Sequence, residues 1–379
     1  MKTTYLLLCL LGIGSVSGAG QTKQPQKIGD FIESTSYNEH RRNATRSLQY
    51  TPDGDDFVCI NGKNRFTRAL NGSHTAFRLE TSDRPVFAAY TKENPKHICF
   101  KLQTSGGTVA LDSTEHCESR YTAGRRSYSL SDPAFGGGSL SITTWALPDK
   151  EGAIWQFNAR NFKEFHPVLL ASISEIRNSK LNRNGDMGAD PADSFEAPLQ
   201  PQQLQSFPVQ IDGTLYMLLE NQELRTLTTA EGETLFKKAE AARSETASRI
   251  RIETPDPYFN TLGSTLAMAA DGIWDGEVWL HGAIGWRMPL SGWRAAYTGD
   301  VLGWHDRART HFNAYAASQV TEVPNTFPHP AQDSALHLAR SVKKWGTPQY
   351  SNGYICRNPH RNNQMHHYDI CLLYTSPSP

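Results

Sequence analysis

The sequence predicts a multidomain β + α protein: an N-terminal antiparallel β-sandwich, then a linker helix, then the start of a toroid of helical hairpins. Three observations predict this order. Short β-branched runs alternate with turn residues from about residue 27 to 220. From Thr228 the apolar residues recur at helical spacing. After Asp256, helical segments alternate with long loops that are rich in aromatic residues.

The sandwich prediction depends on many short strands with no helical pattern between them, which is typical of two packed antiparallel sheets. Glycine-containing turns such as Asn61-Gly62 and Asp212-Gly213 separate the runs. The expected strands include Asp56–Ile60, Val86–Tyr90, His97–Leu102, Ser139–Trp145 and Leu215–Leu219.

The helical part begins with a capping box, in which Thr228 is followed three residues later by Glu231. Further helices are expected at 260–270, 302–320 and 332–344, with a fourth starting near residue 366. The expected domains are a signal peptide at 1–20, the sandwich at 21–227, the linker helix at 228–253, the toroid from 254 to 370, and a non-native tail at 371–379.

Both ends of the chain have features that are not part of the fold. Lys2, the apolar run 5–13 and the small residues 14–20 together have the pattern of a secretory signal peptide, with a buried N-terminal helix as the alternative. We therefore expect a periplasmic or secreted protein. The residues 371–379 are the translation of a common transposase sequencing adapter, although a genuine Ser/Pro tail is the alternative. The toroid is then expected to be truncated after Ile370, and the fragment to be inactive.

Composition narrows the class of protein. The 38 basic residues balance the 38 acidic ones, which gives no case for nucleic acid or an anionic membrane as a partner. No segment after the signal peptide is apolar enough to span a membrane. Outside the two ends the cysteines are Cys59, Cys99, Cys117 and Cys356, and their spacing matches no zinc motif. A Cys99–Cys117 disulfide and free buried thiols are both compatible with the sequence.

Tryptophan is concentrated in one stretch, because five of the eight tryptophans lie between Trp274 and Trp304. The same loops contain Arg, Asp, His and Gly with few aliphatic residues, the reverse of an ordinary core. Indole faces can stack on sugar rings, and Arg and Asp can bind hydroxyl groups. We therefore expect a carbohydrate site here, with a structural role for any single residue as the alternative.

Hydrolysis of a glycosidic bond uses two carboxyl groups. We expect Asp275, Asp300 and Asp306 as the catalytic candidates, and the second acid of the pair can lie beyond the end of the sequence. Asp300 as a helix N-cap and Asp306 in an ion pair are the structural alternatives. The expected substrate-binding residues are Trp274, His281, Trp286, Arg287, Trp293, Arg294, Trp304, His305, Arg307, Tyr354, Arg357, His366, His367 and Asp369.

We expect no metal and no cofactor. His366 and His367 are adjacent, so on a helix their side chains diverge by about 100° and chelate one ion poorly. The stretch 182–190 is rich in Asn and Asp and could hold calcium, but it lacks the EF-hand pattern and is expected to be an ordinary loop. The sequence does not indicate an oligomeric state.

Several long motifs resemble a bacterial family known as domain of unknown function 4450. They are NRFTRALNGSHTAFRLETSDRPVFAAY, NRNGDMGADPADSF, TPDPYFNTLG, WLHGAIGWRMPLSGWRAAYTGDVLGWHDRARTHF and NGYICRNPHRNNQMHHYD, and they span about residues 56 to 369. The resemblance implies an exported protein of polysaccharide-degrading bacteria with an (α/α)6, six-hairpin-glycosidase-like domain. It supplies no catalytic residues.

Three functions remain open at this point. The leading hypothesis is an exported glycoside hydrolase that acts on a polysaccharide or oligosaccharide by carboxylate acid–base catalysis. The second is a polysaccharide lyase, in which Tyr354, His366 or Tyr368 moves the proton and Arg287 or Arg294 neutralises a uronate carboxylate. The third is a glycan-binding protein without catalysis.

Overall fold

The computed structural model describes most of the chain between residues 50 and 319. The described ranges are 50–63, 66–90, 96–162, 166–175, 205–211, 213–282, 289–290 and 293–319. The chain divides into two units, Met1–Leu48 and Gln49–Pro379, and every described residue belongs to the second. The expected signal peptide, the calcium-like stretch 182–190, the helices at 332–344 and 366, Cys356 and the tail 371–379 lie outside the described residues.

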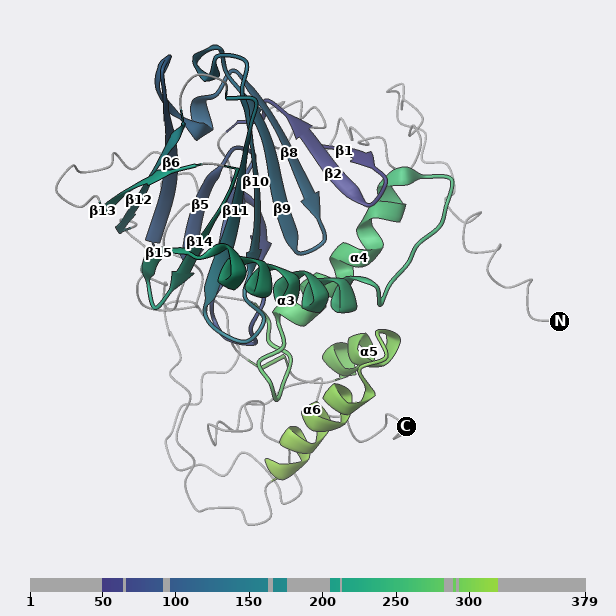
Figure 1. Cartoon of the computed structure of the whole chain (residues 1–379). Coiled ribbons are helices and arrows are strands. Elements are labelled where there is room, and N and C mark those ends of the chain that lie inside the picture. Colours follow the sequence, from purple (N-terminus) through teal and green to yellow (C-terminus); the bar gives the residue numbers. More distant parts are fainter. Residues whose placement is uncertain are drawn as a thin grey trace, which may run out of the picture. The chain divides into compact units, whose positions relative to one another are not determined.

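Two antiparallel sheets form the β part, as the sequence predicts (Figure 1). The eight-stranded sheet has the order β1 (Thr51–Asp53), β2 (Asp56–Ile60), β8 (His116–Thr122), β9 (Arg125–Ser131), β10 (Ser139–Ala146), β11 (Gly152–Arg160), β14 (Thr214–Glu220) and β15 (Glu223–Leu227). The seven-stranded sheet has the order β13 (Gln205–Gln210), β12 (Val168–Glu175), β6 (Lys96–Thr104), β5 (Val86–Tyr90), β4 (Arg78–Ser82) and β3 (Phe66–Leu70), and β7 (Gly107–Ala110) pairs with β6. Two short 3-10 turns, Leu111–Ser113 and Pro133–Phe135, connect strands.

The main core lies between the two sheets, since it takes buried residues from both. Alternation along each strand selects these residues, because successive side chains of a strand point to opposite faces. On β11, Trp155 and Phe157 enter this core, where they meet Phe87 and Phe100 of the other sheet edge to face.

The outer face of the eight-stranded sheet is also apolar, and helix α3 (Thr229–Ala247) packs on it. The alternate residues of β11 and β14, such as Ile154 and Leu218, face Phe236 and Ala239 of the helix. Figure 1 shows α3 lying across the ends of β10, β11, β14 and β15. Strands with two buried faces therefore carry apolar residues on both sides, where a one-sided sheet would alternate.

The start of α3 confirms the predicted capping box. The Thr228 hydroxyl accepts a hydrogen bond from the Glu231 amide, and the Glu231 carboxylate accepts one from the Thr228 amide at 3.0 Å. The helix ends at Ala247 and is thus shorter than the predicted 228–253, because Arg249 and the residues after it leave helical geometry.

We predict that Gly232→Ala destabilises the protein by about 1–2 kcal/mol, although alanine raises helix propensity by about 1 kcal/mol. A Cβ at Gly232 would lie 2.1 Å from Cγ of the buried Tyr216 ring, so the helix must move off the sheet. Urea denaturation measures the change. Ser244→Ala, on the exposed side of the same helix, is the control, and equal stability of the two variants would contradict the prediction.

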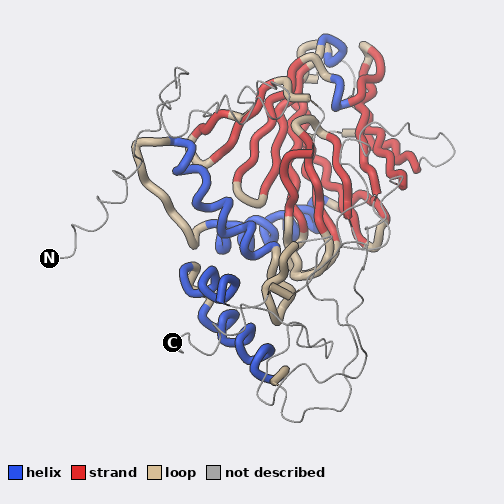
Figure 2. The backbone as a smooth tube through the Cα atoms, turned by 180° about the vertical axis from the view of Figure 1, so that it is seen from behind, coloured by secondary structure: helices blue, strands red, loops and turns tan. Residues whose placement is uncertain are grey.

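Three more helices follow: α4 (Pro257–Gly272), α5 (Trp293–Val301) and α6 (His305–Ala317). Figure 2 shows them in blue beside the red sheets, with α5 and α6 as neighbours. The helix predicted at 302–320 is confirmed as α6, which is three residues shorter at each end, whereas the sequence did not predict α5. A break at 302–304 separates α5 from α6, because Gly303 adopts a left-handed φ of 71° that a helix does not accommodate. Asp300 lies in the last turn of α5 and is not the N-cap residue of α6, which is Trp304.

The three described cysteines are free. Cys117 lies in the core between the sheets, whereas Cys99 is on the opposite face of β6 from the core residues Ile98 and Phe100. The Cys99–Cys117 disulfide is therefore not formed, and the alternative of free thiols holds for these residues. In the described part of the chain, no helix is long and apolar enough to cross a membrane.

Candidate functional site

The loop after α4 is organised by Asp275, the first of the predicted catalytic acids. Its Oδ1 accepts hydrogen bonds from the backbone amides of Glu277 at 3.0 Å and Val278 at 2.7 Å. Gly276, with a φ of 99°, completes this turn, and the Asp275 amide donates to the carbonyl of Val278. One carboxylate oxygen of Asp275 is thus occupied by hydrogen bonds from the backbone, and this favours a structural role over a catalytic one.

Three of the tryptophans of this region pack into a second core. Trp274, Trp279 and Trp304 are buried together with the small residues Ala267 and Ala308, and the rings of Trp274 and Trp279 lie 4.6 Å apart. Small side chains on the helices leave the space that the indoles fill. This corrects the expectation that Trp274 and Trp304 stack on a sugar, since a buried indole has no free face.

Asp271, in the last turn of α4, is the most connected acid of the region. Its Oδ1 accepts a hydrogen bond from Arg307 Nη1 at 2.7 Å and lies 3.3 Å from Nε2 of His74, a residue of the β3–β4 loop. Its side chain is only 9% exposed. Burial alone would raise the pKa of Asp271, but the hydrogen bond from His74 and the charge and hydrogen bond of Arg307 outweigh burial and lower it. Asp271 is therefore ionised and unsuited to donate a proton.

We predict that Asp271 makes the protein acid-sensitive. Because its pKa is lowered in the folded state, its stabilisation is present above the unfolded value of about 3.9 and disappears as the pH falls through the folded value. Asp271→Asn should lower stability at pH 7 and make it less dependent on pH below about 4. Thermal unfolding of both proteins from neutral to acidic pH measures this. Parallel pH curves would contradict the prediction.

Asp300 and His305 form a pair at the break between α5 and α6. His305 Nδ1 lies 3.1 Å from Asp300 Oδ1, and the His305 side chain is 68% exposed and the Asp300 side chain 36% exposed. Hydrogen bonds from the amides of Gly303 and Trp304 to the carbonyls of Asp300 and Gly299 fix the backbone between them. An acid and an imidazole are thus held together at a surface that solvent can reach, and both can take part in proton transfer.

Asp306, the third predicted acid, is on the first turn of α6. It is 95% exposed and its Oδ1 lies 3.0 Å from Arg309 Nη1. This is the ion pair that the sequence offered as the structural alternative, and an exposed pair of this kind contributes little to stability.

The other predicted site residues fall into three groups. His281 is exposed, and Arg307 lies over the Trp304 ring, 4.2 Å from its centroid. Trp293 and Arg294 begin α5, and their side chains are outside the described residues. Also outside the described residues are Trp286, Arg287, Tyr354, Arg357, His366, His367 and Asp369.

Three residues of this region, Asp271, His74 and Tyr297, were not among the predicted site residues. His74 is 197 positions from Asp271, and no local pattern signals a contact over that separation. Tyr297 is 47% exposed on α5, three residues before Asp300, so the two belong to neighbouring positions of one helical face. A helix predicted at 293–301 would have placed Tyr297 beside Asp300 by its spacing, but the sequence did not predict a helix there.

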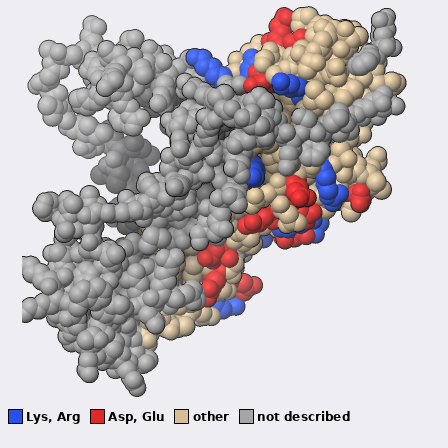
Figure 3. All heavy atoms as spheres, turned by 90° about the vertical axis from the view of Figure 1, so that its left-hand side faces the viewer, with Lys and Arg blue, Asp and Glu red and all other residues tan. Residues whose placement is uncertain are grey.

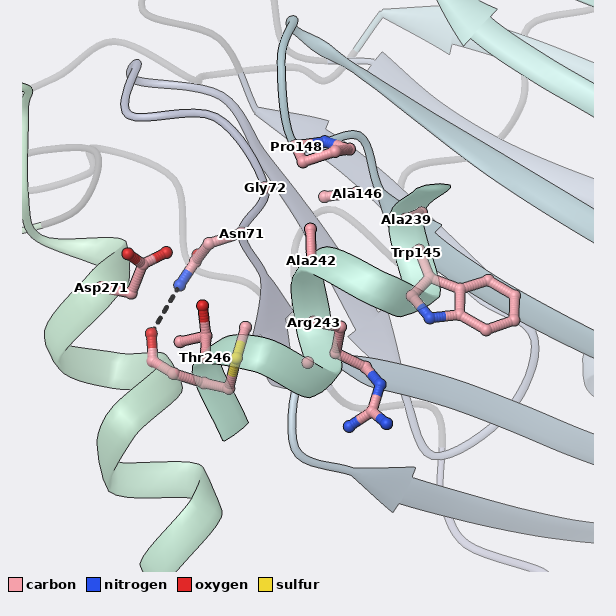
Figure 4. Close-up of a pocket in the computed structure, with 12 residues that line it drawn as sticks. Asn71, Gly72, Trp145, Ala146, Pro148, Ala239, Ala242, Arg243, Thr246 and Asp271 are labelled. Carbon is pink, nitrogen blue, oxygen red and sulfur yellow. Dashed lines mark hydrogen bonds between the residues drawn. The ribbon is translucent and has the colours of Figure 1, made fainter. Parts of the chain in front are cut away.

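A small cavity of about 40 Å³ lies where the sandwich loops meet α3 and α4. Figure 4 shows Asn71, Ala146, Thr246 and Asp271 around it, and Asn71 donates to the Met268 carbonyl at 3.5 Å. Pockets for small molecules usually measure about 300–1,000 Å³, so this cavity has room for water and not for a sugar.

On the described part of the face drawn in Figure 3, acidic and basic side chains lie close to one another. Among the described residues, no three His, Cys, Asp or Glu side chains are placed to hold a metal ion.

The comparison with protein families agrees with the resemblance in the sequence. The model of the family described as Domain of unknown function (DUF4450) matches residues 95–251, from β6 to just beyond α3, which confirms the resemblance over that range. Among solved structures, the chain is similar to a bacterial glucoamylase complexed with acarbose, at 10% identity and a TM-score of 0.37. The match covers 69% of this chain and 53% of that one, so the chain spans about half of its length. No curated protein matches the chain.

Proposed function

We propose that the protein is an exported glycoside hydrolase that acts on a polysaccharide or oligosaccharide by carboxylate acid–base catalysis. The observation that carries the proposal is the Asp300–His305 pair, which is accessible to solvent and fixed at the break between two helices. Asp271 and Asp275 support the choice by contrast, since the first is buried in an ion pair and the second closes a turn.

The pair favours one of the two roles that glycoside hydrolysis requires. A carboxylate that faces an imidazole N–H is held as a hydrogen-bond acceptor. Asp300 is therefore assigned the role of the base that activates water, or of the nucleophile, and not that of the acid that protonates the leaving group. His305 orients Asp300. Tyr297, which is on the same helix as Asp300 and is exposed, is assigned a stacking contact with a sugar ring.

The proposal includes the finer architecture that the sequence predicts. The helices α4 to α6 are assigned to the start of an (α/α)6 toroid, and the acid partner of Asp300 is assigned to residues outside those described. Export to the periplasm or the outside is proposed from the signal-peptide pattern alone.

The test uses the full-length gene product, purified and incubated with a panel of plant and host glycans. Release of reducing sugars, with each product identified by mass, supports the hydrolase. Release of unsaturated, ultraviolet-absorbing products indicates the lyase, and binding without turnover indicates the glycan-binding protein. Either of these two outcomes would overturn the proposed function.

A further inference from the structure

The β3–β4 segment of the sandwich holds the C-terminal end of α4 at three points. Asn71 Nδ2 donates to the carbonyl of Met268 at 3.5 Å, and His74 contacts the carboxylate of Asp271. Arg78, whose side chain is fully buried, donates to the carbonyl of Gly272. A cation at a helix C-terminus is favourable because the last carbonyls of the helix carry partial negative charge. The last turn of α4 is thus fixed to the sandwich.

Asp271 passes this restraint on to α6. The same oxygen that faces His74 accepts the hydrogen bond of Arg307 at 2.7 Å, and the Arg307 side chain is 22% exposed. A charge-assisted hydrogen bond in a largely buried place is among the stronger ones in proteins. Among the described residues, this carboxylate is the ionic partner of Arg307.

Arg307 in turn lies against Trp304, with its Cζ 4.2 Å from the ring centroid. The Trp304 amide donates to the carbonyl of Gly299 at 2.7 Å, so the ring and the break between α5 and α6 move together. Asp300, in the last turn of α5, and His305, the first residue of α6, lie on opposite sides of this break. A continuous set of contacts therefore leads from the sandwich to the acid–imidazole pair.

We propose that Asp271 is a positioning residue, which acts through Arg307 and Trp304 to hold the Asp300–His305 pair in place. This inference rests on the proposed function for its effect on catalysis. It assigns the sandwich a part in the site, because His74 and Arg78 hold the helix that carries Asp271. Asp271 itself does not touch the substrate.

The first test measures the geometry without any activity. Hydrogen exchange of the amides at 302–304 should be about tenfold faster in Asp271→Asn than in the wild-type protein, because the break loses its charged support. Arg307→Met should produce the same change, and the double variant should add little to either single one. Unchanged exchange at 302–304, or fully additive effects, would overturn the proposal.

The second test measures catalysis in the full-length protein on a glycan that it cleaves. Asp271→Asn should lower kcat by about tenfold with KM within about twofold, since positioning affects the reaction more than binding. Glu240→Gln is the matched control, because Glu240 also joins a helix to the sandwich, through Trp145 on β10, while its other partner Arg243 is on its own helix. It should lower stability and leave kcat unchanged.

Equal losses of kcat in Asp271→Asn and Glu240→Gln would overturn the positioning role and leave only a structural one. If the wild-type protein cleaves no glycan, the proposed function fails, while the exchange experiment still decides whether Asp271 holds the break between α5 and α6.

Discussion

Replacement of Arg126 by methionine is expected to lower the free energy of unfolding by about 3–5 kcal/mol. The side chains of Arg126 on β9 and of Asp83 are both fully buried, and Arg126 Nη2 lies 3.6 Å from Asp83 Oδ1. Arg126 Nη2 also donates to the carbonyl of Ser82 at 2.8 Å and to the Tyr50 hydroxyl at 2.9 Å. Methionine would keep part of the packing volume and leave the Asp83 charge buried without its guanidinium.

Urea denaturation measures this loss, and Arg120→Met is the control on the neighbouring strand. Arg120 has ion pairs to Asp53, Asp56 and Glu118, but its side chain is 34% exposed. Its loss should therefore cost about 1 kcal/mol or less. Equal effects of the two substitutions would contradict the view that burial, and not the number of ion pairs, sets the cost.

Asp300→Asn is expected to lower kcat by about 10²–10⁴-fold in the full-length protein, the usual contribution of a base to catalysis. Asparagine has the shape of aspartate and can still accept the hydrogen bond from His305, but it cannot take a proton from water. KM should change little, because the substitution removes an interaction that acts in the transition state. Steady-state kinetics on a cleaved glycan measures both constants.

Asp275→Asn provides the contrast to Asp300→Asn. The oxygen of an asparagine side chain can still accept the two backbone hydrogen bonds that Asp275 accepts, so the turn should survive. We expect this variant to lose less than about tenfold in kcat. A larger loss of kcat in Asp275→Asn than in Asp300→Asn would contradict the assignment of Asp300 as the base and favour Asp275 for that role.

The elements that depend on neighbouring residues could be predicted from the sequence. The strand predicted at 56–60 has the bounds of β2, and the Thr228–Glu231 spacing identifies the start of α3. Both signals are local, because strand faces and helix caps are set within a few residues. One element was missed: the sequence did not predict α5, and the left-handed φ of Gly303, which delays the start of α6 to residue 305, is not revealed by a glycine alone.

The site could be predicted only in part, since its decisive contacts join distant segments. The sequence placed Trp274 near a site but could not show that it packs with Ala267 in a core. Nor could it show that His74 reaches Asp271, because that contact exists only once the sandwich and α4 are packed together. The pairing of Asp300 with His305 required the true position of the helix break.

The most direct test of the central claim, that Asp300 is the base of a glycoside hydrolase, is chemical rescue of Asp300→Ala in the full-length protein. Sugar release should fall by about 10²–10⁴-fold in this variant and rise again when formate is added, because a free carboxylate can occupy the space that the side chain leaves. The wild-type protein should not respond to formate. Sugar release by Asp300→Ala at the wild-type rate, without formate, would contradict the claim.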